Sequence, residues 1–123
     1  MSEATRGLID AYNDAWNRQD LEAICSFHAP GFVFENHTAG ERAEGEAARG
    51  HIGAIFERWP TLRFSTRTLY PAADFAVCEW TASAVRPDGR RIEWDGVDVF
   101  PLRDGKLLRK DIYSSSHAPR VLE

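Results

Sequence analysis

The strongest local constraint in this sequence is a hairpin near its C-terminal end. The dipeptide Asp104-Gly105 stands between two runs rich in Val, Phe, Leu, Ile and Tyr. An Asp-Gly pair between such runs predicts a two-residue type I′ turn. If Arg103 then faces Lys106, counting back along both strands places Asp98 directly opposite Asp111. The turn therefore predicts two carboxylates side by side on one face of a sheet.

A second turn extends this arrangement to a third strand. The segment 87–90 (PDGR) predicts another tight turn, between the runs 75–85 and 90–101. With Val85 opposite Ile92, Glu79 falls opposite Asp98, so that Glu79, Asp98 and Asp111 form an acidic row across three strands. Like charges directly opposed at roughly 4.5–5.5 Å destabilise a sheet. We therefore interpret the acidic row as a functional feature.

The rest of the chain predicts helices first and strands afterwards. Apolar residues recur at helical spacing over residues 2–17, 21–27 and 46–59, with Asp20 as a cap for the second helix and Pro60 as the end of the third. Extended runs cover residues 32–34, 62–70, 75–85, 90–101 and 106–115, and residues 37–45 are expected to form a loop. This order predicts an α+β fold, with three N-terminal helices packed in a strongly curved antiparallel sheet. Such a cone-shaped α+β barrel has an open mouth that suits a small molecule.

Length and charge restrict the class of protein and its partners. The chain has 123 residues, 43% hydrophobic and 28% charged, which predicts a single domain spanning residues 1–123. A net charge of -4 and a pI near 5.6 argue against nucleic acid and anionic membranes as partners. No basic leader with an apolar core and no run of transmembrane length is present, so we expect a cytoplasmic protein.

No sequence motif indicates a cofactor or a metal ion. The four histidines lack the spacing of metal ligands, and neither a P-loop nor a GxGxxG motif after a strand occurs. We therefore expect no cofactor and no metal. The two cysteines, Cys25 and Cys78, form no CxxC motif and are expected to be buried thiols.

Four segments give the sequence a resemblance to a known superfamily. They are residues 12–24 (YNDAWNRQDLEAI), 32–36 (FVFEN), 45–48 (GEAA) and 98–107 (DVFPLRDGKL). Their order and spacing resemble the nuclear-transport-factor-like cone superfamily. Its enzymes include ketosteroid isomerases, SnoaL-type polyketide cyclases, scytalone dehydratase and limonene-type epoxide hydrolases. The resemblance covers nearly the whole chain and implies the same cone-shaped fold.

The resemblance also implies roles for individual residues. Tyr12 and Asp98 resemble the tyrosine and the protonated aspartate that donate hydrogen bonds to the substrate oxyanion in ketosteroid isomerases. The base of those isomerases corresponds to Asn36 here, and Asn36 resembles the asparagine that positions water in the epoxide hydrolases. Asp111 resembles the last-strand acid of the epoxide hydrolases and the SnoaL-type cyclases.

Together, the residues and the resemblance predict a cofactor-independent general acid/base enzyme of the isomerase or cyclase type. Two carboxyl groups inside a pocket share a proton because one of the two pKa values rises. We expect Asp111 to act as the base and Asp98 to donate with Tyr12, while Glu79 tunes the pair; exchanged roles for the two aspartates stay open. The expected substrate is a small hydrophobic oxygenated molecule, such as a polyketide-like or steroid-like carbonyl compound.

Aromatic residues are expected to contact this substrate: Trp16, Phe34, Phe56, Trp94, Phe100 and Tyr113. Epoxide hydrolysis or dehydration in the same pocket is an alternative reaction. A second alternative is a non-catalytic module for small-molecule binding or dimerisation, in which Asp98 and Asp111 face solvent beside Arg109 and Lys106. A homodimer through the outer face of the sheet is expected by analogy in each case.

Overall fold

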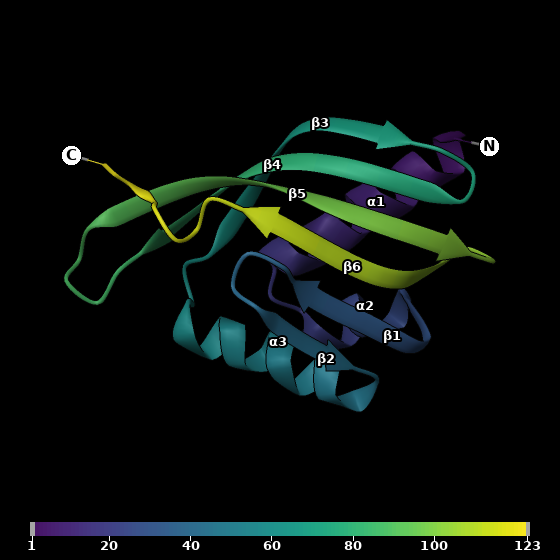
Figure 1. Ribbon diagram of the computed structural model, residues 1–123, viewed down its shortest axis with the longest axis horizontal. Coiled ribbons are helices and arrows are strands. Elements are labelled where there is room, and N and C mark those ends of the chain that lie inside the picture. The colour runs from purple at the N-terminus through teal and green to yellow at the C-terminus, as the bar shows by residue number, and fades with distance from the viewer. Residues whose placement is uncertain (1, 123) are drawn as a thin grey trace.

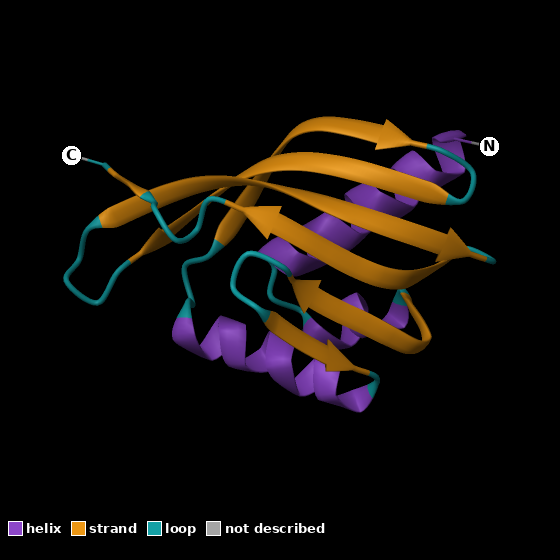
Figure 2. Ribbon diagram, in the orientation of Figure 1, coloured by secondary structure: helices purple, strands orange, loops and turns teal. Residues whose placement is uncertain are grey.

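The computed structural model describes residues 2–122, which form three helices and a large curved sheet (Figures 1 and 2). The helices are α1 (Ser2–Asn17), α2 (Leu21–Ser26) and α3 (Glu46–Arg58). The strands are β1 (His28–Asn36), β2 (Glu41–Glu44), β3 (Arg63–Pro71), β4 (Phe75–Val85), β5 (Arg91–Arg103), β6 (Lys106–Ser114) and β7 (Arg120–Val121). None of the helices in residues 2–122 has the length and apolarity needed to cross a membrane.

The sheet is open and mixed. Its strand order is β2-β1-β6-β5-β4-β3, and β7 pairs with β5. The strands from β3 to β6 form the expected antiparallel meander, whereas β1 runs parallel to β6. The α+β fold with three helices and a curved sheet is therefore confirmed. The strand β2 replaces part of the expected loop because it is a polar edge strand, without the apolar alternation that identifies half-buried strands.

The helices cover the inner face of the sheet. Along α1, the buried residues Thr5, Ile9, Tyr12 and Trp16 are spaced by three or four and form one stripe. This helix packs against β3 and β4, and α3 packs against β1 and β2 (Figure 1). The Asp20 side chain caps α2 as expected, accepting a hydrogen bond from the Ala23 N–H at 3.1 Å.

The turn between β5 and β6 has the predicted type. Asp104 and Gly105 have φ angles of 52° and 72°, as a type I′ turn requires, and Arg103 faces Lys106. One pair further along the ladder, Leu102 faces Leu107. The register near the turn is therefore confirmed.

A bulge changes the register further from that turn. Between the pairs Leu102–Leu107 and Val99–Asp111, β6 contains one residue more than β5. After this bulge Asp98 lies opposite Ile112, while Asp111 lies opposite Val99. The predicted pairing of Asp98 with Asp111 is therefore wrong. Successive side chains of a strand point to opposite faces, so Asp111 lies on the face opposite to that of Ile112 and Asp98.

The turn between β4 and β5 differs from the prediction by one residue. Pro87 takes the second position of a turn closed by the hydrogen bond from the Gly89 N–H to the Arg86 carbonyl at 2.8 Å, and Gly89 has a φ angle of 86°. Proline is common at the second position of a type I turn, because its ring fixes φ near the value that this position needs. In the resulting register Cys78, rather than Glu79, lies opposite Asp98.

The predicted acidic row does not form. Asp98 points to the helix-covered inner face of the sheet and is 3% exposed. Asp111 and Glu79 belong to the outer face, where Glu79 is exposed. Two one-residue differences in register thus separate the three carboxylates.

Candidate functional site

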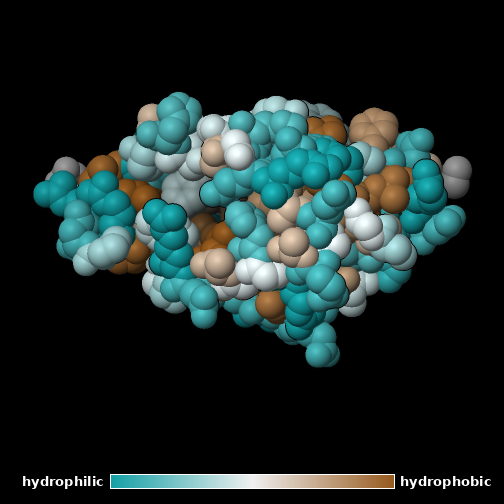
Figure 3. Space-filling view, turned by 60° about the horizontal axis from the view of Figure 1, so that its bottom comes forward, coloured by the Kyte–Doolittle hydropathy of each residue, from teal (hydrophilic) through white to brown (hydrophobic). Residues whose placement is uncertain are grey.

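A cavity of about 190 Å³ lies between the inner face of the sheet and the C-terminal end of α3. Figure 3 shows apolar surface recessed among polar side chains on this side of the molecule. Six aromatic residues line the cavity: Trp16, Phe34, Trp59, Phe64, Trp80 and Trp94. The polar side chains among its lining residues include those of Asn36, Asp98 and Lys110. We call this cavity the pocket.

Asp98 brings a carboxylate into the wall of the pocket. It lies on β5 and faces inward, because it is paired across the sheet with the buried Cys78 and Ile112. Its Oδ1 atom is buried without a hydrogen-bond partner among residues 2–122. Burial raises the pKa of Asp98 above its ordinary value, and the nearby charge of Lys110 opposes this shift. Asp98 therefore has an increased tendency to hold a proton.

Lys110 is the partner of Asp98 in the pocket. It lies on β6, two residues before Ile112 and on the same face, and is 4% exposed. Its Nζ atom is 3.6 Å from Asp98 Oδ2 and 3.9 Å from the centre of the Trp16 ring. Burial lowers the pKa of Lys110, while the ring faces stabilise its charged form. The pocket wall therefore contains an acid and an amine between which a proton can pass.

Lys110 was not predicted from the sequence as a site residue. One signal was present, because only two of the 15 Lys and Arg residues are lysines, Lys106 and Lys110. Lys106 lies beside the Asp104–Gly105 turn, which explains an exposed charge there. Lys110 has no such explanation, but recognising its inward direction requires the bulge in β6.

Further hydrogen-bonding groups surround the pocket. The Nε1 atoms of Trp16 and Trp80 are buried without a hydrogen-bond partner among residues 2–122. Asn36 Oδ1 accepts a hydrogen bond from the Ala39 N–H at 3.1 Å, which holds the amide in place. The Trp80 indole interacts with the Asp98 carboxyl group and the Trp16 indole with the Tyr12 hydroxyl, and both interactions favour the ionised form of the acceptor.

Tyr12 is buried outside the pocket lining. Its hydroxyl lies 2.9 Å from His28 Nε2, and the His28 ring stacks on Phe32 with a centroid distance of 3.5 Å. Burial lowers the pKa of His28 to about 3 and raises the pKa of Tyr12. The structure therefore pairs Tyr12 with a neutral histidine. The predicted joint donation of Tyr12 and Asp98 to one substrate oxygen has no support in this geometry.

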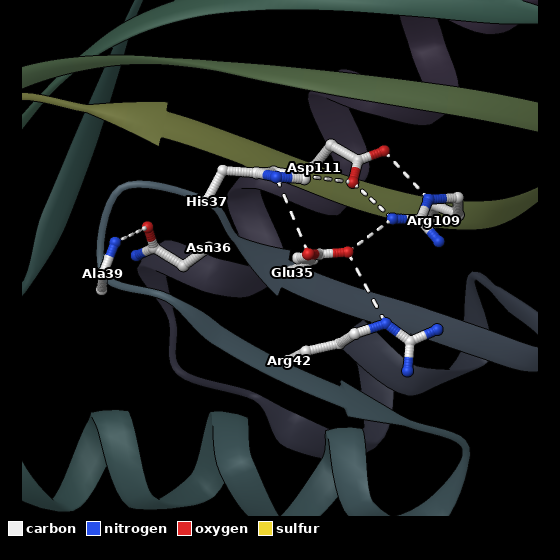
Figure 4. Close-up of polar contacts among 7 residues, drawn as sticks. All are labelled: Glu35, Asn36, His37, Ala39, Arg42, Arg109 and Asp111. Carbon is white, nitrogen blue, oxygen red and sulfur yellow. Dashed lines mark hydrogen bonds and ion pairs between the residues drawn. The ribbon is translucent and has the colours of Figure 1, made fainter.

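Asp111 belongs to an ion-pair network on the outer face (Figure 4). Arg109 donates two hydrogen bonds to its carboxylate at 2.7 and 3.0 Å and a third to Glu35 at 2.9 Å. His37 Nε2 lies 2.8 Å from Asp111 Oδ1. Hydrogen bonding from Arg109 lowers the pKa of Asp111, so this carboxylate stays ionised.

The same network contains the one group of metal-ligand atoms found in residues 2–122. Ligand atoms of Glu35, His37 and Asp111 all lie within 4.8 Å of one another. Arg109 already donates to both carboxylates, so a cation at this position would have to displace its guanidinium. The ion pairs account for the cluster.

The predicted substrate contacts separate into three groups. Trp16, Phe34 and Trp94 line the pocket, as does Asn36. Phe56 and Phe100 belong to the buried core. Tyr113 is 46% exposed on the outer face, where it stacks on His37.

Comparison with known protein families shows the family of this chain. The SnoaL-like domain family matches residues 9–110. The chain belongs to the SnoaL-like family. A search of the curated proteins gives no match for this SnoaL-like protein.

Solved structures share the fold over nearly the whole length. A putative SnoaL-like polyketide cyclase from Jannaschia sp. CCS1 is 20% identical with a TM-score of 0.83, covering 95% of this chain and 89% of its own. SalBIII, an epoxide hydrolase/cyclase-like enzyme of pyran ring formation in the polyether salinomycin, is 18% identical with a TM-score of 0.84, covering 98% and 97%. TerC, co-crystallised with polyporic acid, is 19% identical with a TM-score of 0.83, covering 94% of each chain. At these identities the likeness establishes the fold alone.

Proposed function

We propose that this SnoaL-like protein is a cofactor-independent acid/base enzyme of the cyclase or isomerase type, acting on a small hydrophobic carbonyl compound in the pocket. The observation that carries the proposal is the position of Asp98. Its carboxylate lines the pocket, is 3% exposed and has one oxygen without a partner among residues 2–122. A carboxylate held in this way is suited to exchanging protons with a bound molecule.

The mechanism follows from the charges beside Asp98. The carboxylate removes a proton from the carbon next to the substrate carbonyl, and negative charge develops on the carbonyl oxygen. The Lys110 ammonium group, 3.6 Å from Asp98 Oδ2, stabilises that oxygen. Protonated Asp98 then returns the proton to another carbon, or the enolate carbon attacks an electrophile within the same molecule and closes a ring.

The volume and the walls of the pocket restrict the substrate. A volume of about 190 Å³ is below the range of roughly 300–1,000 Å³ found for pockets that bind drug-sized ligands. The pocket therefore favours a compound with one or two rings over one as large as a steroid. Its aromatic walls favour a flat, apolar ring system. The similar fold of a putative polyketide cyclase and the co-crystallisation of TerC with polyporic acid are consistent with a small organic ligand.

The proposal is tested by replacing Asp98 and assaying small enones and β-keto compounds for isomerisation and ring closure. Asp98→Asn keeps the shape of the side chain but removes its ability to exchange a proton, so kcat/KM is expected to fall by about a hundredfold or more. The matched control is Asp10→Asn, which makes the same change at an exposed position of α1. Equal turnover by the wild-type protein and Asp98→Asn would refute the proposal.

Epoxide opening is the second candidate function, favoured by Asn36. This residue lines the same pocket as Asp98, and its amide is held by the Ala39 N–H. Asn36 provides an amide that can orient water, and Asp98 provides a carboxylate that can remove the proton of that water. Product analysis separates the two functions, because epoxide hydrolysis yields a diol, whereas isomerisation leaves the composition of the substrate unchanged.

The homodimer and the cytoplasmic location remain predictions from the sequence. Large apolar side chains on the outer face, those of Tyr70, Phe75 and Tyr113, are between 46% and 54% exposed and support an interface there. Light scattering during size-exclusion chromatography would measure the mass in solution. A mass equal to that of one chain at all concentrations would contradict the dimer.

A further inference from the structure

Lys110 is an unusual amine in this protein. Basic residues of the chain are nearly all arginines, with Lys106 and Lys110 as the two lysines. A buried arginine stays charged, whereas a buried lysine can lose its proton and become a nucleophile. The only lysine with its side chain inside the molecule thus lies in the wall of the pocket. An arginine at position 110 could also form an ion pair with Asp98 but could not act as a nucleophile, so the presence of a lysine there indicates a chemical role.

Burial favours the neutral form of the Lys110 amine, against the aromatic ring faces and the Asp98 charge, which favour the ammonium form. Its Nζ atom lies among aromatic rings and has the Asp98 carboxylate as its ion-pair partner among residues 2–122. Burial shifts both pKa values toward the neutral forms, lowering that of Lys110 and raising that of Asp98. Moving the proton from Lys110 to Asp98 replaces two buried charges by a free amine and a carboxylic acid, which are less costly to bury.

We propose that Lys110 forms a Schiff base with an aldehyde or ketone group of the substrate, with Asp98 as the acid and base of that step. This inference rests on the proposed function, because it concerns the same pocket and the same class of substrate. It assigns Lys110 a covalent role in place of a purely electrostatic one.

The step balances without any further reactant. The Nζ lone pair attacks the carbonyl carbon, the carbonyl π bond breaks, and its oxygen receives the proton of Asp98. The resulting carbinolamine gives an Nζ proton to Asp98, and Asp98 returns it to the hydroxyl group, which leaves as water. The products are one protonated imine, one water molecule and the Asp98 carboxylate, and hydrolysis by the reverse route restores Lys110 and the protonated Asp98.

The Schiff base also explains how the pocket would assist proton removal. A protonated imine attracts electrons more strongly than a carbonyl group and makes the adjacent C–H bond more acidic. Asp98, 3.6 Å from Lys110 Nζ, is placed to accept that proton. The same pair of residues would then support both isomerisation and ring closure.

Reductive trapping tests the inference directly. Wild-type protein is incubated at neutral pH with benzaldehyde, a one-ring probe, and sodium cyanoborohydride, which converts an imine into a stable secondary amine. Peptide mass spectrometry then compares Lys110 with the exposed Lys106 in the same sample. We expect Lys110 to be modified several-fold faster than Lys106, because burial lowers its pKa and so increases the fraction of free amine at neutral pH.

Four variants accompany the wild-type protein in this experiment. Lys110→Arg removes the nucleophile and keeps a positive charge, so modification at this position must disappear while circular dichroism stays unchanged. Lys106→Arg and Asp10→Asn are expected to leave the rate at Lys110 unaltered. Asp98→Asn is expected to slow it, because the proton carrier is gone.

The outcomes separate this inference from the proposed function. Modification of Lys106 and the terminal amine, but not of Lys110, would overturn the Schiff base. If Asp98→Asn still abolished turnover in that case, the proposed function would stand without the covalent step. Selective trapping at Lys110 combined with full turnover by Asp98→Asn would support Lys110 as the nucleophile and overturn the role of Asp98 as acid and base.

Discussion

Gly96 on β5 lies directly opposite Trp80 on β4, and the Trp80 indole occupies the space next to the Gly96 backbone. A Cβ atom on Gly96 would come within 2.3 Å of the ring. Glycine at this position therefore allows the indole to lie against the sheet and form a wall of the pocket. The architecture of the pocket depends on a residue that has no side chain.

Gly96→Ala is accordingly expected to displace the Trp80 ring and to lower the free energy of unfolding by about 1–3 kcal/mol, the usual cost of overpacking. Urea denaturation measures this change, and the tryptophan fluorescence spectrum should shift with it. Gly50→Ala is the matched control, since Gly50 lies in α3 with no atom within 4 Å of an added Cβ. That variant is expected to gain roughly 0.5–1 kcal/mol, because alanine is the better helix former.

Asp111→Asn distinguishes the sequence-based assignment from the structural one. A catalytic Asp111 predicts a loss of about a hundredfold in turnover. The structure instead places this residue in the Arg109 network on the outer face. We expect turnover within about twofold of the wild type and a decrease in unfolding free energy of about 1 kcal/mol. Turnover assays and urea denaturation of the same sample would decide between the two.

The fold was predictable because its signals are local. The Asp104–Gly105 turn fixes its own φ angles, the Asp20 cap acts within three residues, and the extent of α1 follows from apolar spacing. Each signal is confirmed by the structure. The strand order of the meander follows in turn from short antiparallel connections.

The site was only partly predictable because register errors propagate. Pro87 at the second position of its turn adds one residue to the connection, and the bulge in β6 adds one residue to the next pair of strands. A shift by one residue exchanges the two faces of a strand. The prediction and the structure both place Asp98 in the pocket. The prediction also placed Asp111 there, whereas the structure places its sequence neighbour Lys110 in the pocket wall.

Acid is expected to destabilise the protein through His28. Burial lowers the pKa of His28 in the folded state from 6.5 to about 3. Between these values the unfolded chain binds the proton and the folded protein does not, so stability is lost as the pH falls through this window. The contribution of this histidine is about 1.4 kcal/mol per pH unit, measurable by urea denaturation at a series of pH values.

His28→Gln should remove this part of the pH dependence. Tyr12→Phe is the informative control, since it deletes the hydroxyl that contacts His28 Nε2 but leaves the ring buried. Because burial is the main cause of the shift, Tyr12→Phe should keep most of the wild-type slope. An unchanged slope in His28→Gln would mean that another group is responsible.

Replacing Asp98 and Lys110 together shows whether the pair is retained for stability or for chemistry. In Lys110→Met the Asp98 carboxyl is buried without its partner, its folded-state pKa rises further, and the variant should lose stability relative to the wild type as the pH rises above about 4. The double variant Asp98→Leu/Lys110→Met leaves no buried charge and is expected to be as stable as the wild type or more stable by about 1–4 kcal/mol. It should nevertheless show neither turnover nor reductive trapping at position 110. A double variant less stable than both single variants would instead assign the pair to the stability of the fold, since two apolar side chains would then have failed to replace it.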